Sequence, residues 1–203
     1  MGELILLADR FADRSRPGAG GDVAFFFDVT SPFSYLAAER IERMLGEVEW
    51  IPCAQVRAPH PGACAEAERE ALAQRLPLVW PEAWPVHWRG ALRAAAYAAD
   101  AGRAAQFAVA AGRLAFCGGF DLEDPEILCE AAAAAGLAPE DCLAAAGDPG
   151  WDAQPKATAE GLLRRGIDEM PALRVGRQWL SGPGAIAQAA GLMRAGTAAL
   201  HSA

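Results

Sequence analysis

Strand-like sequence occurs at only two widely separated places in this chain of 203 residues, and this constrains the fold more than any other feature. The first place opens with the apolar, aromatic run Val23–Phe27, which is typical of a strand buried on both faces. A helix is predicted from Ser31, a suitable N-cap, to Gly46, and a second strand over Val48–Pro52. Because such crossovers are right-handed, these elements form one βαβ unit with parallel strands.

Strand signals return only at Ala172–Val175 and Gln178–Leu180, where the intervening Gly176 and Arg177 predict a hairpin turn. A last helix is expected over Ala185–Arg194. Between the two places the chain is rich in alanine and predicted to be helical. The helices expected there are Cys64–Gln74, Trp88–Asp100, Arg103–Phe116, Asp124–Ala135, Pro139–Ala146 and Gln154–Arg165.

This order of elements predicts an α/β chain with a thioredoxin-like fold that is interrupted by a large all-helical insertion. The thioredoxin-like domain is assigned to residues 22–63 and 151–203, and the helical insertion to residues 64–150. Residues 1–21 form an N-terminal extension whose end, Pro17–Gly21, is rich in breakers and predicts a linker. No function is assigned to this extension.

Composition excludes several classes of partner. Hydrophobic residues make up 53% of the chain and charged residues 22%, so a packed core is expected rather than disorder. The net charge of −8 and the lack of a dense Lys/Arg cluster argue against nucleic acid. No apolar run reaches the roughly 18 residues that would predict a membrane span. The first residues lack the basic region of a secretory signal, which favours a cytoplasmic protein.

The cysteines predict no disulfide framework and no metal site. Their number is odd and no CxxC pair occurs, whereas disulfide scaffolds and zinc sites need paired or clustered ligands. Isolated reduced thiols in the cytoplasm are therefore expected. The five cysteines are Cys53, Cys64, Cys117, Cys129 and Cys142.

Two segments carry a family resemblance: Phe26–Leu36, which reads FFDVTSPFSYL, and Met170–Gly176, which reads MPALRVG. Together they resemble the DsbA-like branch of the thioredoxin superfamily, and within it the 2-hydroxychromene-2-carboxylate isomerases and the kappa-class glutathione transferases. Redox thioredoxins carry a CxxC motif where this chain has Ser31, Pro32, Phe33 and Ser34. Since a hydroxyl cannot form or exchange a disulfide, dithiol redox chemistry is excluded at this locus.

The resemblance implies that Ser31 contacts the sulfur of bound glutathione as the catalytic residue, with Pro32, Phe33 and Ser34 beside it. A hydroxyl donor at a helix N-terminus would stabilise a thiolate there. The alternatives are that Ser31 is only an N-cap and Ser34 only a first-turn residue. Pro171 is expected to follow a cis bond, which would leave the backbone of Met170 able to pair with the peptide. The alternative is a trans proline beginning a strand.

Two stretches depart from the relatives. Relatives carry an acidic residue in the turn before the last helix, where it holds the γ-glutamyl group, but this chain has Ser181-Gly182-Pro183-Gly184. Ser181 and the amide of Gly182 could still hold a carboxylate. Trp84, His87 and Trp88 are candidates for the wall of a substrate pocket, although tryptophans in such a segment also suit the core.

The resemblance, together with these residues, implies a glutathione-dependent isomerase or transferase acting on a small aromatic or conjugated electrophile, similar to 2-hydroxychromene-2-carboxylate isomerase. Because the acidic residue is missing, the thiol cofactor could be glutathione or a different thiol. One alternative is a catalytically silent binding module with a thioredoxin fold. The other is a DsbA-family thiol–disulfide oxidoreductase, which the fold alone favours. The expected partner is a small molecule. A homodimer is a second expectation, because related proteins are often dimers.

Overall fold

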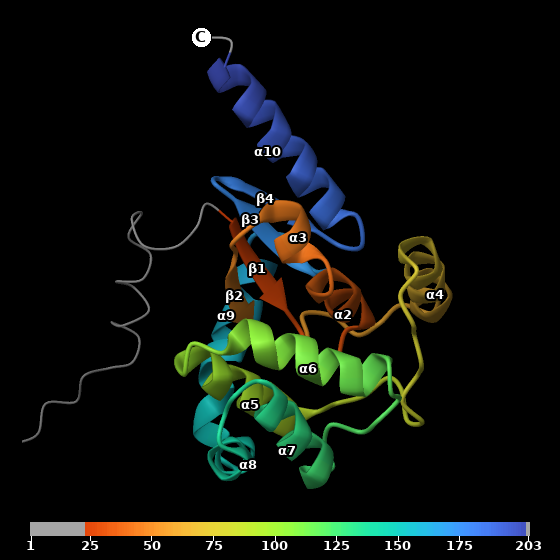
Figure 1. Ribbon diagram of the computed structural model, residues 1–203, viewed down its shortest axis with the longest axis vertical. Helices are drawn as coiled ribbons and strands as arrows, with labels where there is room; N and C mark the ends of the chain where they lie inside the picture. Colours follow the sequence, from red (N-terminus) through yellow and green to blue (C-terminus); the bar gives the residue numbers. More distant parts are fainter. Residues whose placement is uncertain (1–22, 202–203) are drawn as a thin grey trace, which may run out of the picture.

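A computed structural model describes residues 23–201 of the chain, with side chains to residue 195 (Figure 1). The extension and linker expected at residues 1–21 lie outside the described residues. The strands are β1 (Val23–Phe27), β2 (Glu49–Pro52), β3 (Ala172–Val175) and β4 (Gln178–Ser181). The helices are α2 (Pro32–Ala38), α3 (Ile41–Leu45), α4 (Ala63–Gln74), α5 (Arg89–Asp100), α6 (Ala104–Phe116), α7 (Pro125–Ala134), α8 (Pro139–Gly147), the short 3-10 helix η1 (Pro149–Asp152), α9 (Ala153–Leu163) and α10 (Ala185–His201).

The four strands form one mixed sheet in the order β2-β1-β3-β4. β1 pairs with β2 in parallel, with Phe25 opposite Trp50, which confirms the predicted βαβ unit. β3 runs antiparallel to β1 and to β4, which confirms the predicted hairpin. The two segments that carry strand signals therefore meet at β1, the strand that leads into Ser31.

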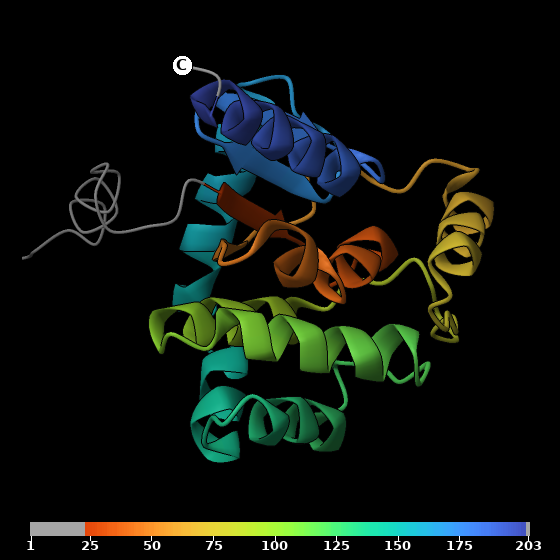
Figure 2. The ribbon, with the colours of Figure 1, turned by 45° about the horizontal axis from the view of Figure 1, so that its top comes forward.

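Helices cover both faces of the sheet, and the side chains of β1 are therefore buried on both sides. Phe25 and Phe27 pack with α2, α3 and α10 on one face. Ala24 and Phe26 pack on the other face with Leu162 of α9. The helices α5 to α8 of the insertion lie on the side of α2 that faces away from β3 and β4, and among them α6 contacts α2 (Figure 2).

Close packing between α2 and α6 depends on a glycine. A Cβ atom at Gly112 would lie 3.1 Å from the Cδ2 atom of Tyr35, so only glycine fits without displacing that ring. The Tyr35 hydroxyl donates a hydrogen bond to the carbonyl of Pro77 at 2.9 Å. These contacts fix α2 between the sheet and the insertion.

Two predicted helices differ from the observed ones. The helix predicted from Ser31 to Gly46 is broken after Ala38, where the N–H of Arg40 bonds to the carbonyl of Ala37, three residues back, and Arg40 leaves helical geometry. The last helix continues past the predicted end at Arg194 to His201. Within residues 23–201, no helix is long and apolar enough to cross a membrane.

Candidate functional site

The site lies where β1 ends and α2 begins. Ser31 has extended backbone geometry, and its hydroxyl oxygen accepts a hydrogen bond from the N–H of Ser34 at 3.3 Å, so it is the N-cap of α2. Its hydroxyl hydrogen remains available to a further acceptor. The N–H of Phe33 makes no hydrogen bond within the described part of the chain. Two donors therefore converge at the start of α2, which has only seven residues and hence a modest dipole.

Ser34 has a structural role. Its side chain is buried, and its hydroxyl oxygen accepts a hydrogen bond from the N–H of Asp28 at 3.1 Å. This bond satisfies a buried backbone donor in the turn between β1 and α2. The hydroxyl oxygen of Ser34 is therefore engaged within the protein, as expected for a first-turn residue.

Asp28 is a buried carboxyl that the sequence reasoning missed. Its residue is 3% exposed, and one carboxyl oxygen accepts hydrogen bonds from the N–H and the hydroxyl of Thr30, both at 2.8 Å. Loss of hydration raises the pKa of Asp28 to about 6, although the Thr30 bonds and the charge of His87 act in the opposite direction. An acidic residue directly after three phenylalanines was the signal available in the sequence.

The peptide bond between Met170 and Pro171 is cis, as expected. Since Phe26 lies opposite Ala172 in the antiparallel register, Pro171 is placed beside the end of β1. The carbonyl of Pro171 accepts a hydrogen bond from the N–H of Gly182 at 3.0 Å. The three segments SPFS, MP and SG thus come together at the end of the sheet where β1 stops and β3 begins.

A pocket lies between α2 and α6, with an empty volume of about 230 Å³ that includes its open mouth. Asp28, Ser31 and Ser34 contribute its polar wall, and the insertion contributes Ala108 and Gly112. The remaining lining residues are Phe27, Val29, Tyr35 and Ala38. The helical insertion therefore closes one side of the Ser31 site.

The three candidates for a substrate wall have different surroundings. Trp88 is 3% exposed and its ring packs against Phe116, so it is a core residue and the pocket assignment fails for it. Trp84 is half-buried and packs on Trp80, with ring centroids 4.7 Å apart. His87 is exposed. Its charge helps to lower the pKa of Asp28, so His87 lies on the same side of the molecule as Asp28.

Cys53 is the cysteine beside Asp28, at the end of β2. It is fully buried, its N–H bonds to the carbonyl of Phe27, and its thiol donates to the carbonyl of Ala54 at 3.2 Å. Burial, followed by the negative charge of Asp28, raises the pKa of this thiol. Cys53 therefore stays protonated at neutral pH and is a poor nucleophile.

This sheet order, with a helical insertion and serine at the N-cap of the first helix, defines a thioredoxin-like protein without the dithiol. The chain belongs to the DSBA-like thioredoxin domain family, whose model matches residues 22–191. A search of curated protein sequences gave no match.

Solved structures share this fold at low sequence identity. A 2-hydroxychromene-2-carboxylate isomerase is similar, with a TM-score of 0.72, 17% identity, and coverage of 88% of this chain and 98% of the other. The oxidoreductase DsbA from Xylella fastidiosa is similar, with a TM-score of 0.55, 14% identity, and coverage of 93% and 90%. The fold therefore includes an isomerase as well as an oxidoreductase.

Proposed function

We propose that this protein is a glutathione-dependent isomerase or transferase that acts on a small aromatic or conjugated electrophile. The observation that carries the proposal is Ser31: a hydroxyl that caps α2 and still has a proton to donate, at the position where the redox members carry sulfur. A hydrogen bond donated to a thiolate would favour the charged form and lower the pKa of the thiol.

The residues around Ser31 fit a short thiol peptide. The N–H of Phe33 offers a second donor to the sulfur. The N–H and carbonyl of Met170 make no hydrogen bond within residues 23–201, so they are free to pair with an extended cysteinyl backbone. When bound, glutathione would supply a thiolate that can add to an activated double bond and leave again.

We place the electrophile at the mouth of the pocket between α2 and α6, beside the position of the sulfur. Its wall is largely apolar, and the carboxyl of Asp28 faces it together with Ser31. Because the pKa of Asp28 is raised to about 6, this group can take up or release a proton close to neutral pH. His87 lies on the same side, where its charge opposes the rise in the pKa of Asp28. Asp28 would handle protons at the substrate while Ser31 holds the sulfur.

The test compares the thiol pKa of bound glutathione in the wild type with that in Ser31→Ala. Ultraviolet absorbance of the thiolate, followed against pH, reports this pKa directly. A hydrogen bond to a charged group contributes about 1.5–3 kcal/mol, so the substitution should raise the pKa by about one to two units. Ser31→Thr is the matched control, because it keeps the hydroxyl and the cap, and its pKa should stay near that of the wild type.

Calorimetry with S-methyl glutathione completes the test, because this ligand has no ionisable thiol. Ser31→Ala should bind it about as well as the wild type does. An unchanged thiol pKa in Ser31→Ala would contradict the proposed role of Ser31. Absence of any glutathione binding by the wild type would favour the silent binding module instead.

A further inference from the structure

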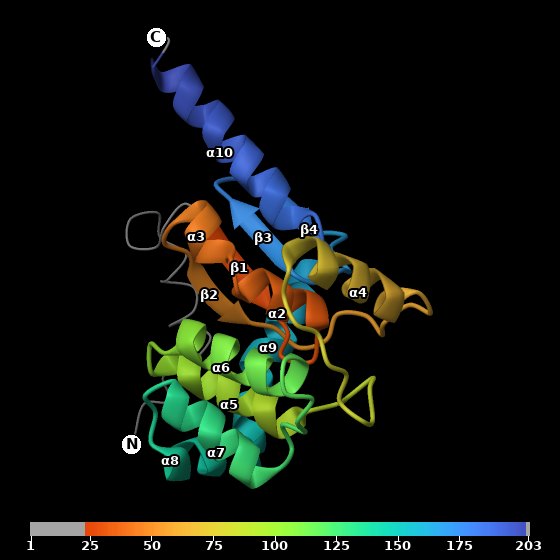
Figure 3. The ribbon, with the colours of Figure 1, turned by 45° about the vertical axis from the view of Figure 1, so that its right-hand side comes forward.

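The sheet has an open edge at β4. The strand order places β4 outermost, beyond β3, and Figure 3 shows the strands in this order. The opposite edge strand, β2, carries the exposed Glu49 and ends at Pro52, and both kinds of residue discourage pairing with a further strand. β4 has neither a charged residue nor a proline. Of the two edges, the one at β4 is therefore better suited to accept a further strand.

Two residues of β4 direct their backbone groups away from β3. The N–H of Gly182 bonds to the carbonyl of Pro171 at 3.0 Å, and bonded positions alternate with unbonded ones along an antiparallel pair. Leu180 therefore faces β3 with its N–H and carbonyl, whereas Trp179 and Ser181 face outward. Within residues 23–201, the backbone groups of these two residues bond to no other part of the chain. Donors and acceptors are thus available along this edge.

Both faces of the sheet are incompletely covered beside this edge. The ring of Trp179 lies on the α9 face, with its centroid 5.4 Å from that of Phe26, and Leu180 lies on the α10 face. Both side chains pack on an apolar cluster and yet remain only half-buried. A further strand with apolar residues on both faces would extend both clusters.

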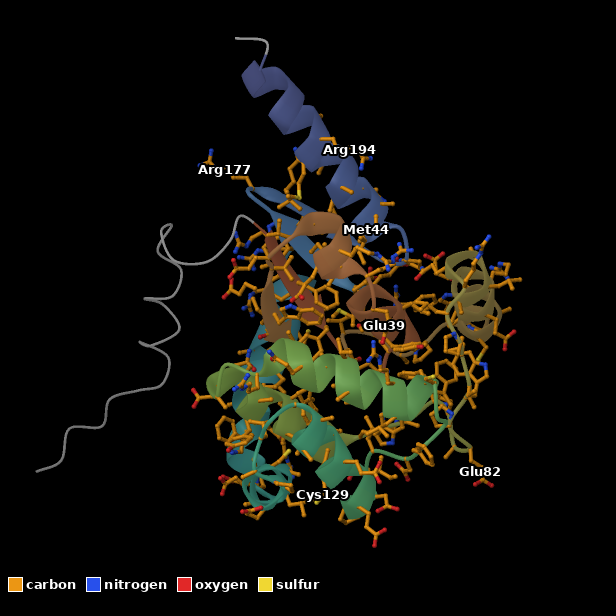
Figure 4. All side chains as sticks on the ribbon, viewed as in Figure 1. Glu39, Met44, Glu82, Cys129, Arg177 and Arg194 are labelled. Carbon is orange, nitrogen blue, oxygen red and sulfur yellow. The ribbon has the colours of Figure 1, made fainter. Side chains whose placement is uncertain are left out.

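Two arginines lie near the hairpin end of β4. The guanidinium of Arg165 lies over the ring of Trp179, 5.2 Å from its centroid. Arg177 is exposed in the turn that leads into β4, and its side chain points away from the sheet (Figure 4). Neither arginine forms an ion pair within the part of the chain that the structure describes. These charges favour a strand that has an acidic residue at this end.

The first residues of the sequence match these features. Residues 4–8 read LILLA, an unbroken apolar run, and the acidic residues Glu3 and Asp9 lie on either side of it. A short run of this kind is typical of a strand that is buried on both faces, as the run VAFFF of β1 is. The same run could form one face of a helix, but a helix would leave the outward groups of Trp179 and Ser181 unpaired.

The chain between this run and β1 is long enough to reach the edge. Val23 lies opposite Val175, which lies opposite Gln178, so β1 and β4 begin at the same end of the sheet. Neighbouring strands are about 4.8 Å apart, which places the position beyond β4 about 15 Å from Val23. Residues 10–22 connect Asp9 to Val23, and a chain of this length can span about 40 Å.

We propose that residues 4–8 pair with the outer edge of β4 as a fifth strand, antiparallel to β4. In this direction the segment ends at the hairpin end of β4, where the connection to Val23 is shortest, and Asp9 lies beside Arg177 and Arg165. The segment closes an edge at which another chain could otherwise pair. None of these residues belongs to the Ser31 site, so the proposal is independent of the proposed function.

Amide hydrogen exchange of the full chain, followed by NMR, tests the proposal residue by residue. In the wild type the amides of Trp179 and Ser181 should be protected, as that of Leu180 is by its bond to β3. Neighbouring residues of a strand alternate, so Ile5→Pro combined with Leu6→Pro removes at least one N–H that points at β4. Exchange at Trp179 and Ser181 should then become at least about tenfold faster. Exchange at Leu180 should stay unchanged, which makes it an internal reference.

The matched control for the double proline variant is Ala19→Pro combined with Gly20→Pro, which makes the same change outside residues 4–8. It should leave the exchange of the three β4 amides within about twofold of the wild type.

A charge exchange tests the direction of the strand. Arg177→Glu places a like charge beside Asp9 and should speed the exchange of the two outward amides by roughly threefold to tenfold. Adding Asp9→Lys should restore most of the protection. Arg43→Glu makes the same change at an exposed position on α3 and should alter neither amide. Rescue by Glu3→Lys in place of Asp9→Lys would overturn the antiparallel direction.

Three further outcomes would overturn the proposal. Fast exchange at Trp179 and Ser181 in the wild type would mean that no strand covers this edge. Protection that survives the double proline substitution and grows with protein concentration would make a second copy of the chain the occupant. Protection that survives it equally at every concentration would place a different part of this chain at the edge.

Discussion

Two aspartates in poorly hydrated surroundings illustrate two different uses of a charge. Asp28, at the end of β1, is 3% exposed, and no described residue forms an ion pair with it. Asp152, at the start of α9, has a side chain that is 19% exposed and is bonded to Arg93 and Lys156, each at 2.8 Å. Burial raises the pKa of Asp28 to about 6, whereas hydrogen bonds from Arg93 and then Lys156 lower the pKa of Asp152 to about 2.

The difference separates a functional region from a structural one. Arg93 lies on α5 of the insertion and also donates to the carbonyl of Ala146, so the Asp152 cluster joins the insertion to the helix that returns to the sheet. Every charge in that cluster has a partner. The turn beside Ser31 instead keeps a carboxyl that forms no ion pair within the described residues, and its raised pKa leaves a group able to exchange protons near neutral pH.

The comparison predicts opposite effects when each aspartate is replaced by asparagine, and the larger effect belongs to Asp28. Above about pH 4 the unfolded chain releases this proton while the folded chain holds it until about pH 6, so the free energy of unfolding falls across this range. Asp28→Asn removes this penalty and can still accept the bonds from Thr30. At pH 7 the variant should be more stable by about 1–3 kcal/mol, from about 1.4 kcal/mol per pKa unit.

Urea unfolding at several pH values between 3 and 8 tests this prediction. The gain in Asp28→Asn should vanish below about pH 4, where both states of the wild type are protonated. If the variant were less stable than the wild type at pH 7, the carboxylate would have a stabilising partner and the contrast with Asp152 would disappear.

Asp152→Asn should have the opposite sign. A depressed pKa contributes stability above the unfolded value of about 3.8, and this contribution is lost as the pH falls towards 2. At pH 7 the variant should lose about 1–2 kcal/mol, since the pair is partly exposed to solvent. Unfolding curves at pH 7 and at pH 2–3 should show the loss at the higher pH only. Asp100→Asn, at an exposed position on α5, should change little.

Sequence patterns predicted the fold because each pattern reports local chemistry. The run Val23–Phe27 is apolar at every position, and the Gly176-Arg177 turn separates two short strands, so the parallel pair β1–β2 and the hairpin β3–β4 followed from these elements. The predicted ends of the helices lie within about two residues of the observed ones, apart from the break at Arg40 and the extension of α10. The break at Arg40 has no Pro or Gly signal in the sequence.

The site was only partly accessible from the sequence. The motif pointed to Ser31, but the environment of Asp28 depends on burial by Val29, Tyr35 and the insertion. Helix α4 contacts α2, and nothing in the sequence of either helix shows that they pack together. Trp88 was assigned to the pocket because its neighbours are aromatic, yet its ring completes the core against Phe116. Long-range packing decided each of these cases.

A smaller effect is expected from the cap of Ser31. Ser31→Ala loses the bond from the N–H of Ser34, and such N-cap losses cost about 1 kcal/mol. Ser31→Asn, which retains a capping oxygen, should recover most of this stability without restoring a hydroxyl. Thermal unfolding of the two variants measures the loss of the cap. The pKa of bound glutathione in the same two variants measures the loss of the hydroxyl. If both variants had the same low stability, Ser31 would not act as a cap.

The smallest effect is expected at the ion pair between α2 and α6. Arg113 donates from Nε to one oxygen of Glu39 at 2.6 Å and from a terminal nitrogen to the other at 2.8 Å, and Glu39 lies at the end of α2 above α6 (Figure 4). The Glu39 side chain is 12% exposed but that of Arg113 is 60% exposed, so water and salt reach this pair through Arg113, whereas Arg93 and Asp152 are only 14% and 19% exposed. Arg113→Gln should therefore cost about 0.5 kcal/mol, and the loss should shrink as salt is raised from 0.05 to about 0.5 M. A loss as large as that of Asp152→Asn would mean that this bridge, and not the packing of Gly112 on Tyr35, fixes α2 against the insertion.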